Sequence, residues 1–364
     1  MNIAFYAPLK SPDHPVPSGD RQMARLLIEA LKLAGHHVQI VSRMRSYLAE
    51  PTAHAMAELE AEARVEADRI AAGWRHSGIP DQWFCYHPYY KAPDLIGIIL
   101  APMFGIPYAT AEASYSDRRN VGVRAEAQAR VVESIKLANI NFCFTRRDRD
   151  GLASIAPGAR LEMLPPYIDT APFAASAAQD HPSRLVTIAM MRKGDKFDSF
   201  KMLAQALAFI VDLPWTLTVI GDGEMRSKIV ALFTAIPANR IEWLGEVDPD
   251  RVPELLQSGG IYVWPGFGEA YGLAYLEAQA AGFAVVAQDT AGVPEVVQNG
   301  ITGILTRPGD AGAFAAAIRR LLTSHGHRRR MASAARRFVL SERSLPQAAQ
   351  RIEMIMADAA SRAS

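Results

Sequence analysis

Short apolar runs alternate with longer amphipathic segments along most of the chain. Asn2–Ala7 and His37–Ser42 are apolar runs of strand length. Between them, the hydrophobic residues of segment 21–34 recur at helical spacing, and Gly35 is a typical helix stop. A succession of strand, helix and strand builds a parallel sheet covered by helices on both faces. We therefore predict an α/β protein.

The same alternation continues through the first half of the chain and restarts in the second. Strands are expected at Trp83–Pro88, Ile106–Glu112 and Ile140–Thr145, and helices at Ala53–Trp74 and Glu126–Asn139. Segment 164–184 has no periodicity, and its Pro and small polar residues are typical of a linker. Further strands are then expected at LVTIAM, TLTVI, RIEWLGEV, IYVWP and AVVAQ, followed by a helical tail.

Length and composition agree with two domains. A chain of 364 residues is too long for one hydrophobic core. Residues 1–170 contain 19 basic and 19 acidic residues, so the basic excess of a general nucleic-acid binder is missing. The two cysteines, Cys85 and Cys143, form no disulfide framework. We expect a cytoplasmic protein without a signal peptide, because no basic segment precedes the first apolar run.

A glycine-rich loop in the second half contains a carboxylate. Gly266, Gly268 and Gly272 surround Glu269. The spacing is one residue too long for a dinucleotide fingerprint, and a carboxylate would repel a pyrophosphate. Glu269 is better suited to accept hydrogen bonds from a hydroxyl-rich group.

The residues that follow the loop complete a candidate binding unit. The backbone amides of Tyr271, Gly272 and Leu273 open a helix and are suited to bind a diphosphate. Glu277 lies eight residues after Glu269, close to two helical turns, and therefore on nearly the same face. A sugar, a diphosphate and a ribose are the groups that this unit would hold. The simpler alternative is a helix N-terminal charge at Glu269 and a solvated face at Glu277.

At this point the sequence resembles the retaining glycosyltransferases of family four, which have the two-domain GT-B fold. The resemblance is strongest in the segment WPGFGEAYGLAYLEAQAAGFAVVAQDTAGVPEVVQNGITGIL, with its E-x₇-E motif. It also includes SGDRQMARLLIEALKLAGHHV, YHPYYKAPDL, MMRKGDKFDS, VIGDGE and WLGEV. The resemblance implies two Rossmann-like, doubly wound domains that face a central cleft. They would be an acceptor domain, 1–170, a donor domain, 171–340, and a C-terminal helix, 341–364, that returns to the first domain.

The resemblance also implies roles for charged residues. Glu269 would accept hydrogen bonds from hydroxyl groups of the donor sugar, and Glu277 would bind the ribose. Arg192 and Lys196 match the pair that neutralises the donor diphosphate, although the family spacing is usually one residue longer. Lys193 is therefore an alternative to Lys196, and a basic loop in solvent is the alternative to both.

The resemblance also extends to loop positions and to one histidine. The loop positions are Gly19, Gly221, Gly245 and Val247. His87 corresponds to a histidine near the reacting sugar. Gly19 would approach the diphosphate, although Ser18 stands where the family has a second glycine, and Asp20 is a possible cap of the next helix. Turns that flank the nucleotide would contain Gly221, Gly245 and Val247.

We therefore predict a retaining, metal-independent hexosyltransferase without a cofactor. It would transfer a sugar from a nucleoside diphosphate sugar, UDP in preference to GDP, to a hydroxyl acceptor such as a glycolipid or cell-envelope glycan. A nucleotide-sugar epimerase and a non-catalytic nucleotide-sugar binding module are the alternatives. A group of six arginines forms either a docking surface for an anionic membrane or a solvated surface paired with neighbouring aspartates: Arg118, Arg119, Arg124, Arg146, Arg147 and Arg149.

Overall fold

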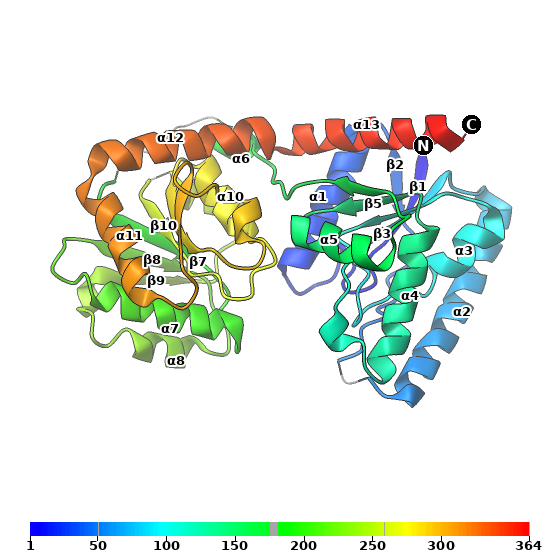
Figure 1. Ribbon diagram of the computed structural model, residues 1–364, viewed down its shortest axis with the longest axis horizontal. Coiled ribbons are helices and arrows are strands. Elements are labelled where there is room, and N and C mark those ends of the chain that lie inside the picture. Colours follow the sequence, from blue (N-terminus) through cyan, green and yellow to red (C-terminus); the bar gives the residue numbers. More distant parts are fainter. Residues whose placement is uncertain (50, 175–180, 258, 364) are drawn as a thin grey trace. The chain divides into compact units, whose positions relative to one another are not determined.

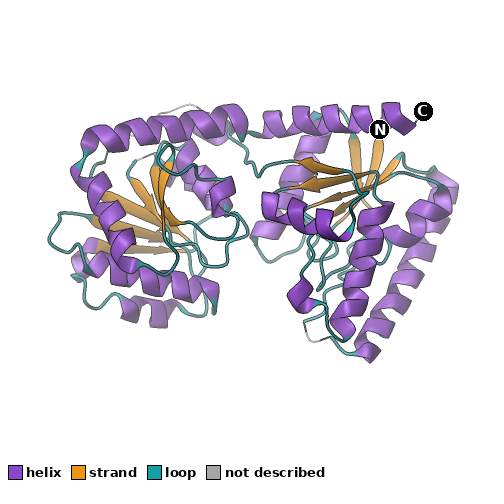
Figure 2. Ribbon diagram, viewed as in Figure 1, coloured by secondary structure: helices purple, strands orange, loops and turns teal. Residues whose placement is uncertain are grey.

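The computed structural model describes residues 1–49, 51–174, 181–257 and 259–363. The chain divides into two compact units, shown with their elements in Figure 1. Unit 1 comprises Met1–Pro165 and Leu345–Ser364, and unit 2 comprises Pro166–Ser344. Each unit is a parallel sheet with helices on both faces (Figure 2), as the alternating pattern predicts.

The sheet of unit 1 has the strand order β2-β1-β3-β4-β5-β6, with every neighbouring pair parallel. Its strands are β1 (Asn2–Tyr6), β2 (His37–Ile40), β3 (Gln82–Tyr86), β4 (Tyr108–Ala111), β5 (Ile140–Cys143) and β6 (Leu161–Met163). Its helices are α1 (Gly19–Leu33), α2 (Ala53–Ser77), α3 (Gly97–Phe104), α4 (Val123–Leu137), α5 (Arg146–Ile155) and α13 (Leu345–Ala363), with a 3₁₀ turn η1 (Asp117–Arg119). The strand order reverses between β1 and β3.

The sheet of unit 2 has the order β12-β11-β10-β7-β8-β9, also parallel throughout. Its strands are β7 (Arg184–Ile188), β8 (Thr216–Ile220), β9 (Ile241–Gly245), β10 (Ile261–Val263), β11 (Ala284–Gln288) and β12 (Gly303–Thr306). Its helices are α6 (Ala171–Ala174), α7 (Asp195–Ala208), α8 (Arg226–Leu232), α9 (Val252–Leu256), α10 (Leu273–Ala280), α11 (Ala311–Thr323) and α12 (His325–Glu342), with 3₁₀ turns η2 (Ala238–Arg240), η3 (Pro249–Arg251) and η4 (Val293–Glu295). This is the Rossmann strand order, and it reverses between β7 and β10.

The last helix returns to the first unit, as predicted. α13 packs along α1. Asp358 on α13 forms an ion pair with Arg160 at 2.6 Å, and the Arg351 Nε donates a hydrogen bond to the Met163 carbonyl. The chain therefore completes unit 1 only after it has passed through unit 2.

Several expected elements end earlier or later than the pattern predicts. The strand expected at Trp83–Pro88 ends at Tyr86, because His87 takes a left-handed φ of 58°. Helix α2 continues past Trp74 to Ser77, where Gly78 ends it with φ 104°. Of the predicted linker, residues 175–180 lie outside the described part of the chain, and Ala171–Ala174 form the short helix α6.

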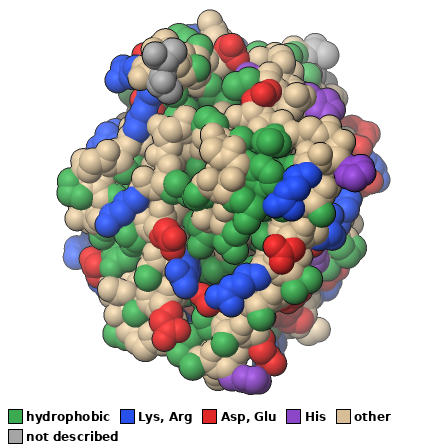
Figure 3. Space-filling view, turned by 90° about the vertical axis from the view of Figure 1, so that its right-hand side faces the viewer, with side chains coloured by type: hydrophobic (Ala, Val, Ile, Leu, Met, Phe, Trp, Pro, Cys, Tyr) green, Lys and Arg blue, Asp and Glu red, His purple; other side chains and the backbone are tan. Residues whose placement is uncertain are grey.

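Charge is evenly distributed on the face drawn in Figure 3. Basic and acidic side chains are interspersed there among hydrophobic ones, and no large area carries a single sign. This face agrees with the near-neutral composition, with 39 basic and 38 acidic residues in the chain. Among the described residues, no helix is sufficiently long and apolar to cross a bilayer.

Candidate functional site

In unit 2, the predicted donor residues gather where the strand order reverses. Open α/β sheets bind ligands outside the carboxyl ends of the strands at such a point. Here the two loops concerned follow β7 and β10. The first contains Arg192 and leads to Lys196 in the first turn of α7, and the second contains Glu269. The topology therefore brings together three residues that lie up to 77 positions apart in the sequence.

The loop after β10 needs its glycines because it packs closely on its neighbours. Gly268 has φ 62°, and a Cβ there would lie 2.1 Å from the Asp195 Oδ2. Gly266 has φ 77°, and its Cβ would lie 2.2 Å from the Tyr275 hydroxyl oxygen. The Phe267 amide donates a hydrogen bond to the Ser199 Oγ at 3.0 Å, which fastens the loop to α7. Glycine at these two positions therefore allows the loop to pack against α7, where Lys196 lies.

Glu269 is held by two donors at one of its oxygens. The Lys196 Nζ forms an ion pair with the Glu269 Oε1, and the Trp264 indole Nε1 donates to the same oxygen at 2.9 Å. The Lys196 ammonium also lies 5.5 Å from the centroid of the Trp264 ring. The Glu269 side chain is 15% exposed, and Oε2 has no hydrogen-bond partner among the described residues. Oε2 is thus available to accept a hydrogen bond from a hydroxyl group.

The cations on either side of Gly194 differ in their surroundings. The Lys193 side chain is exposed and pairs with no carboxylate in the described part of the chain, and its backbone amide points to Glu224. Lys196 is half-buried beside Glu269. The Arg192 side chain is exposed and has no hydrogen-bond or ion-pair partner among the described residues. Of the two lysines, the geometry therefore favours Lys196, and Arg192 is available for an anion.

The start of α10 presents backbone donors at Gly272 and Leu273. α10 begins at Leu273 after Gly272, whose φ is 81°. The amides of Gly272 and Leu273 have no acceptor among the described residues. Tyr271 is buried and Glu277 half-buried. Burial raises the pKa of the Tyr262 phenol, and the charges of Glu269 and Glu277 raise it further, so both carboxylates lie near this ring.

The turns after β8 and β9 close against the loop after β7. A Cβ on Gly221, which has φ 136°, would lie 2.0 Å from the Ala189 carbonyl oxygen, and the Gly221 amide donates to the Gly245 carbonyl at 2.7 Å. Gly223 approaches the Met191 carbonyl in the same way. Val247 is half-buried beyond the end of β9. Gly221 and Gly245 therefore shape the backbone around the candidate site.

In unit 1, His87 lies at the point where the strand order reverses between β1 and β3. Its Nδ1 lies 3.1 Å from the Asp20 Oδ1, and its ring stacks on Tyr89 with centroids 4.7 Å apart and an interplanar angle of 19°. The His87 side chain is 18% exposed. Burial alone would lower the pKa of His87, but the carboxylates of Glu112, Asp20 and Asp148 outweigh burial and raise it to about 9.

The contacts of Asp20 and the backbone conformation of Gly19 differ from those that the sequence indicates. Ser18 caps α1, because its side chain accepts a hydrogen bond from the Arg21 amide, and Asp20 instead pairs with His87. Gly19 is the first residue of α1, its φ is not positive, and a Cβ there would meet no atom within 4 Å. Gly19 therefore needs neither a left-handed backbone nor a missing side chain at this position.

Sequence reasoning missed Glu112, which lies beside His87. Glu112 follows β4, the neighbour of β3, and also has a left-handed φ, 56°. The Tyr86 hydroxyl donates to the Glu112 Oε2 at 2.9 Å. Burial raises the pKa of Glu112 to about 7, although the His87 charge lowers it. Glu112 could have been identified as a carboxylate at the end of β4, the strand that pairs with β3.

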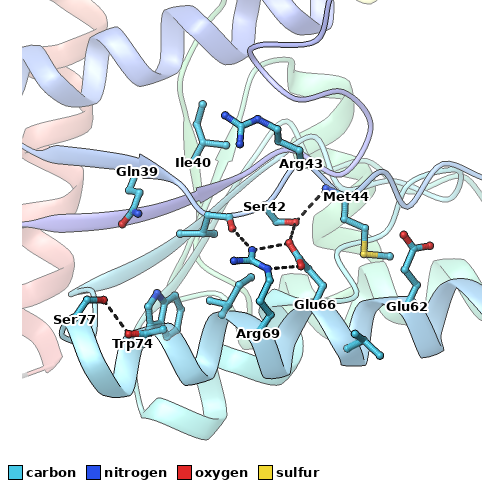
Figure 4. A pocket seen from close by; sticks show the side chains of 14 residues that line it. Gln39, Ile40, Ser42, Arg43, Met44, Glu62, Glu66, Arg69, Trp74 and Ser77 are labelled. Carbon is cyan, nitrogen blue, oxygen red and sulfur yellow. Dashed lines mark hydrogen bonds and ion pairs between the residues drawn. The ribbon is translucent and has the colours of Figure 1, made fainter.

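A cavity of about 610 Å³ lies between the end of β2 and helix α2 in unit 1 (Figure 4). Three of its polar side chains, those of Ser42, Glu66 and Arg69, bond to one another. Glu66 accepts hydrogen bonds from the Ser42 Oγ and the Arg69 guanidinium, which also donates to the Val41 carbonyl. No described group in this network is left to bind a charged ligand. Among the described residues, no set of three or more His, Cys, Asp or Glu side chains is placed to hold a metal ion.

Known proteins resemble the chain in sequence. Residues 182–324 match the family model of glycosyl transferases group 1. A D-inositol 3-phosphate glycosyltransferase of Corynebacterium diphtheriae is 24% identical over 301 residues, which are 75% of this chain and 70% of that protein. The sulfoquinovosyl transferase SQD2 of Arabidopsis thaliana is 34% identical over 123 residues, but the match covers only 24% of that protein.

Solved structures resemble the chain over its whole length. Sucrose-phosphate synthase of Thermosynechococcus elongatus superposes with a TM-score of 0.77 at 17% identity, over 100% of both chains. HepE of Anabaena, solved in complex with UDP-glucose, gives a TM-score of 0.72 at 15% identity, over 98% of this chain and 100% of that one. These structures confirm the predicted GT-B fold, and together with the sequence matches they support a glycosyltransferase.

Proposed function

We propose that the chain is a retaining glycosyltransferase that transfers a sugar from a nucleoside diphosphate sugar to a hydroxyl acceptor. The observation that carries this proposal is the group formed by Glu269, Lys196 and Trp264 at the β7/β10 reversal point. Lys196 and Trp264 occupy one oxygen of Glu269 and orient the other for a sugar hydroxyl. A carboxylate that is already held in place loses little conformational entropy when it binds the sugar.

The diphosphate would lie between Arg192 and the start of α10. The Arg192 guanidinium and the amides of Gly272 and Leu273 are donors without an acceptor among the described residues. Arg binds two phosphate oxygens at once, and a helix N-terminus favours anions. Glu277 lies further along α10 and would accept hydrogen bonds from the ribose hydroxyls. The order of sugar, diphosphate and ribose then follows the order of these residues along the loop and helix.

In the proposed reaction, the acceptor oxygen bonds to the anomeric carbon as the bond from that carbon to the diphosphate breaks. The electron pair of that bond goes to the leaving phosphate, which takes the acceptor proton. Negative charge therefore grows on the diphosphate, and Arg192 and Lys196 would stabilise it more in the transition state than in the ground state. His87 would contribute a hydrogen bond to the sugar or to the developing charge. Neither a metal ion nor an enzyme nucleophile enters this scheme.

Uracil is the nucleotide base that we favour. HepE has been solved with UDP and with UDP-glucose. In this chain the base would meet backbone groups near Gly245, the last residue of β9, and Val247, two residues beyond it.

The test is product formation from a panel of nucleoside diphosphate sugars, measured as released UDP or GDP with and without candidate acceptors. We expect UDP release from a UDP-sugar, retained in EDTA. Arg192→Ala should lower release by about 10²-fold or more, the scale of losing one transition-state charge contact. Lys193→Ala is the matched control, because this neighbouring lysine does not pair with Glu269. Tight UDP binding without any release would identify a binding module instead.

A further inference from the structure

Three cations surround the ring of Tyr90 in unit 1. The Lys91 Nζ lies 5.8 Å, the Arg119 Cζ 6.0 Å and the Arg124 Cζ 5.9 Å from the ring centroid. They come from three different segments: the loop after β3, the 3₁₀ turn η1, and the first turn of α4. We call these four residues the Tyr90 cluster.

The Tyr90 cluster has no counter-charge of its own. None of its three cations forms an ion pair or a side-chain hydrogen bond with another described residue. Other arginines nearby do have carboxylate partners. Arg149 pairs with Asp150 at 2.7 Å, and Arg130 pairs with Glu60 at 3.0 Å. The arginine-rich stretch therefore contains paired arginines, such as Arg130 and Arg149, and two that are unpaired among the described residues, Arg119 and Arg124, around one aromatic ring.

Like charges that converge on one ring repel each other, and an anion between them would relieve the repulsion. Cation–π contact with Tyr90 fixes their positions without neutralising them. A carboxylate needs only one guanidinium to satisfy both of its oxygens. Three cations that approach from different segments are better matched by a tetrahedral phosphate monoester, which has three acceptor oxygens and a charge between −1.5 and −2 at pH 7.

Aromatic contacts connect the Tyr90 cluster to His87. Tyr89 stacks on the His87 ring at 4.7 Å, and Tyr90 meets Tyr89 edge-on at 5.3 Å. Two ring contacts, from Tyr90 to Tyr89 and from Tyr89 to His87, therefore connect the cluster to the histidine that we place near the reacting sugar. A small acceptor could contact both at once.

We propose that the Tyr90 cluster binds a phosphate group of the acceptor, so that the acceptor is a phosphorylated hydroxyl compound. This inference rests on the proposed glycosyltransferase function. Arg119 and Arg124 would each fork two phosphate oxygens, and Lys91 would add a point charge. The reacting hydroxyl would then extend past Tyr89 toward His87. The phosphate would fix the orientation of the acceptor without taking part in the bond changes.

The test is calorimetric titration of the full chain with inorganic phosphate. UDP is present in excess, so that the donor site does not bind the probe. The test variant is Arg119→Gln with Arg124→Gln. The control is Arg118→Gln, a neighbour in the same 3₁₀ turn that does not lie over Tyr90. We expect the double variant to weaken phosphate binding about 10-fold or more, and the control to change it less than about 2-fold. Equal affinity in all three proteins, or equal loss in both variants, would overturn the proposal.

Two further titrations distinguish a free phosphate compound from a lipid headgroup as the source of the phosphate. A third keeps the test of the cluster independent of the proposed function. Glucose 6-phosphate and vesicles containing phosphatidic acid are tested with the same variants. If the double variant weakens binding of glucose 6-phosphate alone, the acceptor is a free phosphate compound. If it also weakens binding to the vesicles, the acceptor is lipid-linked. Both results support the cluster. Vesicle binding that Arg118→Gln reduces as much as the double variant would show general attraction to a charged surface and contradict it. If UDP does not bind, the donor assignment fails, and the titration is repeated in Arg192→Ala, where it still tests the cluster.

Discussion

Replacement of Asp20 by Asn should lower the pKa of His87. The pKa of His87 is raised to about 9 from the ordinary histidine value of 6.5, although burial opposes the rise. At about 1.4 kcal/mol per pH unit, this rise favours the imidazolium by about 3 kcal/mol net, and the carboxylates contribute more than that because burial opposes them. Asn retains a hydrogen-bond acceptor but removes the charge. Because the Asp20 side chain is 36% exposed, solvent screens it, and we expect a fall of about 1 unit.

The assay is NMR titration of the His87 ring between about pH 6 and 10, a range in whose lower part Glu112, with its pKa of about 7, also ionises. The raised pKa also has a consequence for stability. The pair stabilises the folded state fully below the ordinary histidine pKa, and this contribution is lost as the pH rises through about 9. In Asp20→Asn the loss should still begin near the ordinary histidine pKa but be complete about 1 pH unit lower. Asp13→Asn is the control, because Asp13 lies in the loop before α1 but pairs with Arg43. An unchanged His87 pKa in Asp20→Asn, or an equal fall in the control, would refute this reasoning.

Three other changes test the site in unit 2. Glu277→Ala should weaken UDP binding by about 2–4 kcal/mol in calorimetry, the scale of two charge-assisted hydrogen bonds to a ribose, and unchanged affinity would remove Glu277 from the site. Arg192→Ala should reduce turnover far more than UDP affinity, and equal losses would make Arg192 a docking residue only. Gly268→Ala should lower the melting temperature, because a left-handed φ and a Cβ 2.1 Å from Asp195 together strain the loop, whereas Gly19→Ala, with open space around it, should not.

The fold could be predicted from the sequence because its apolar runs and helical periods are long and regular. Both parallel sheets, the reversal points and the returning helix follow from that pattern and the resemblance. Strands β6 and β12 were not predicted, because they have three and four residues and only partly apolar patterns. Their place at the end of each sheet is set by pairing with β5 and β11 rather than by local sequence.

The candidate site was predictable only in part. Arg192, Lys196 and Glu269 could be selected by charge and motif, but not the ion pair between Lys196 and Glu269, which depends on two loops meeting at a reversal point. Glu112 was missed because a single glutamate after a strand carries no motif. Its proximity to His87 arises only when β3 and β4 pair. The sequence around Asp20 indicates only a helix cap, because its partner His87 lies 67 residues away.

The central claim is that a uridine nucleotide binds at the β7/β10 reversal point of unit 2. Amide hydrogen exchange with and without UDP tests it most directly, because each peptide reports its own protection. Binding should slow exchange in residues 190–196 and 264–277, the loop after β7 and the loop and helix after β10. UDP binding that leaves both segments unprotected, or protects only segments of unit 1, would contradict the account.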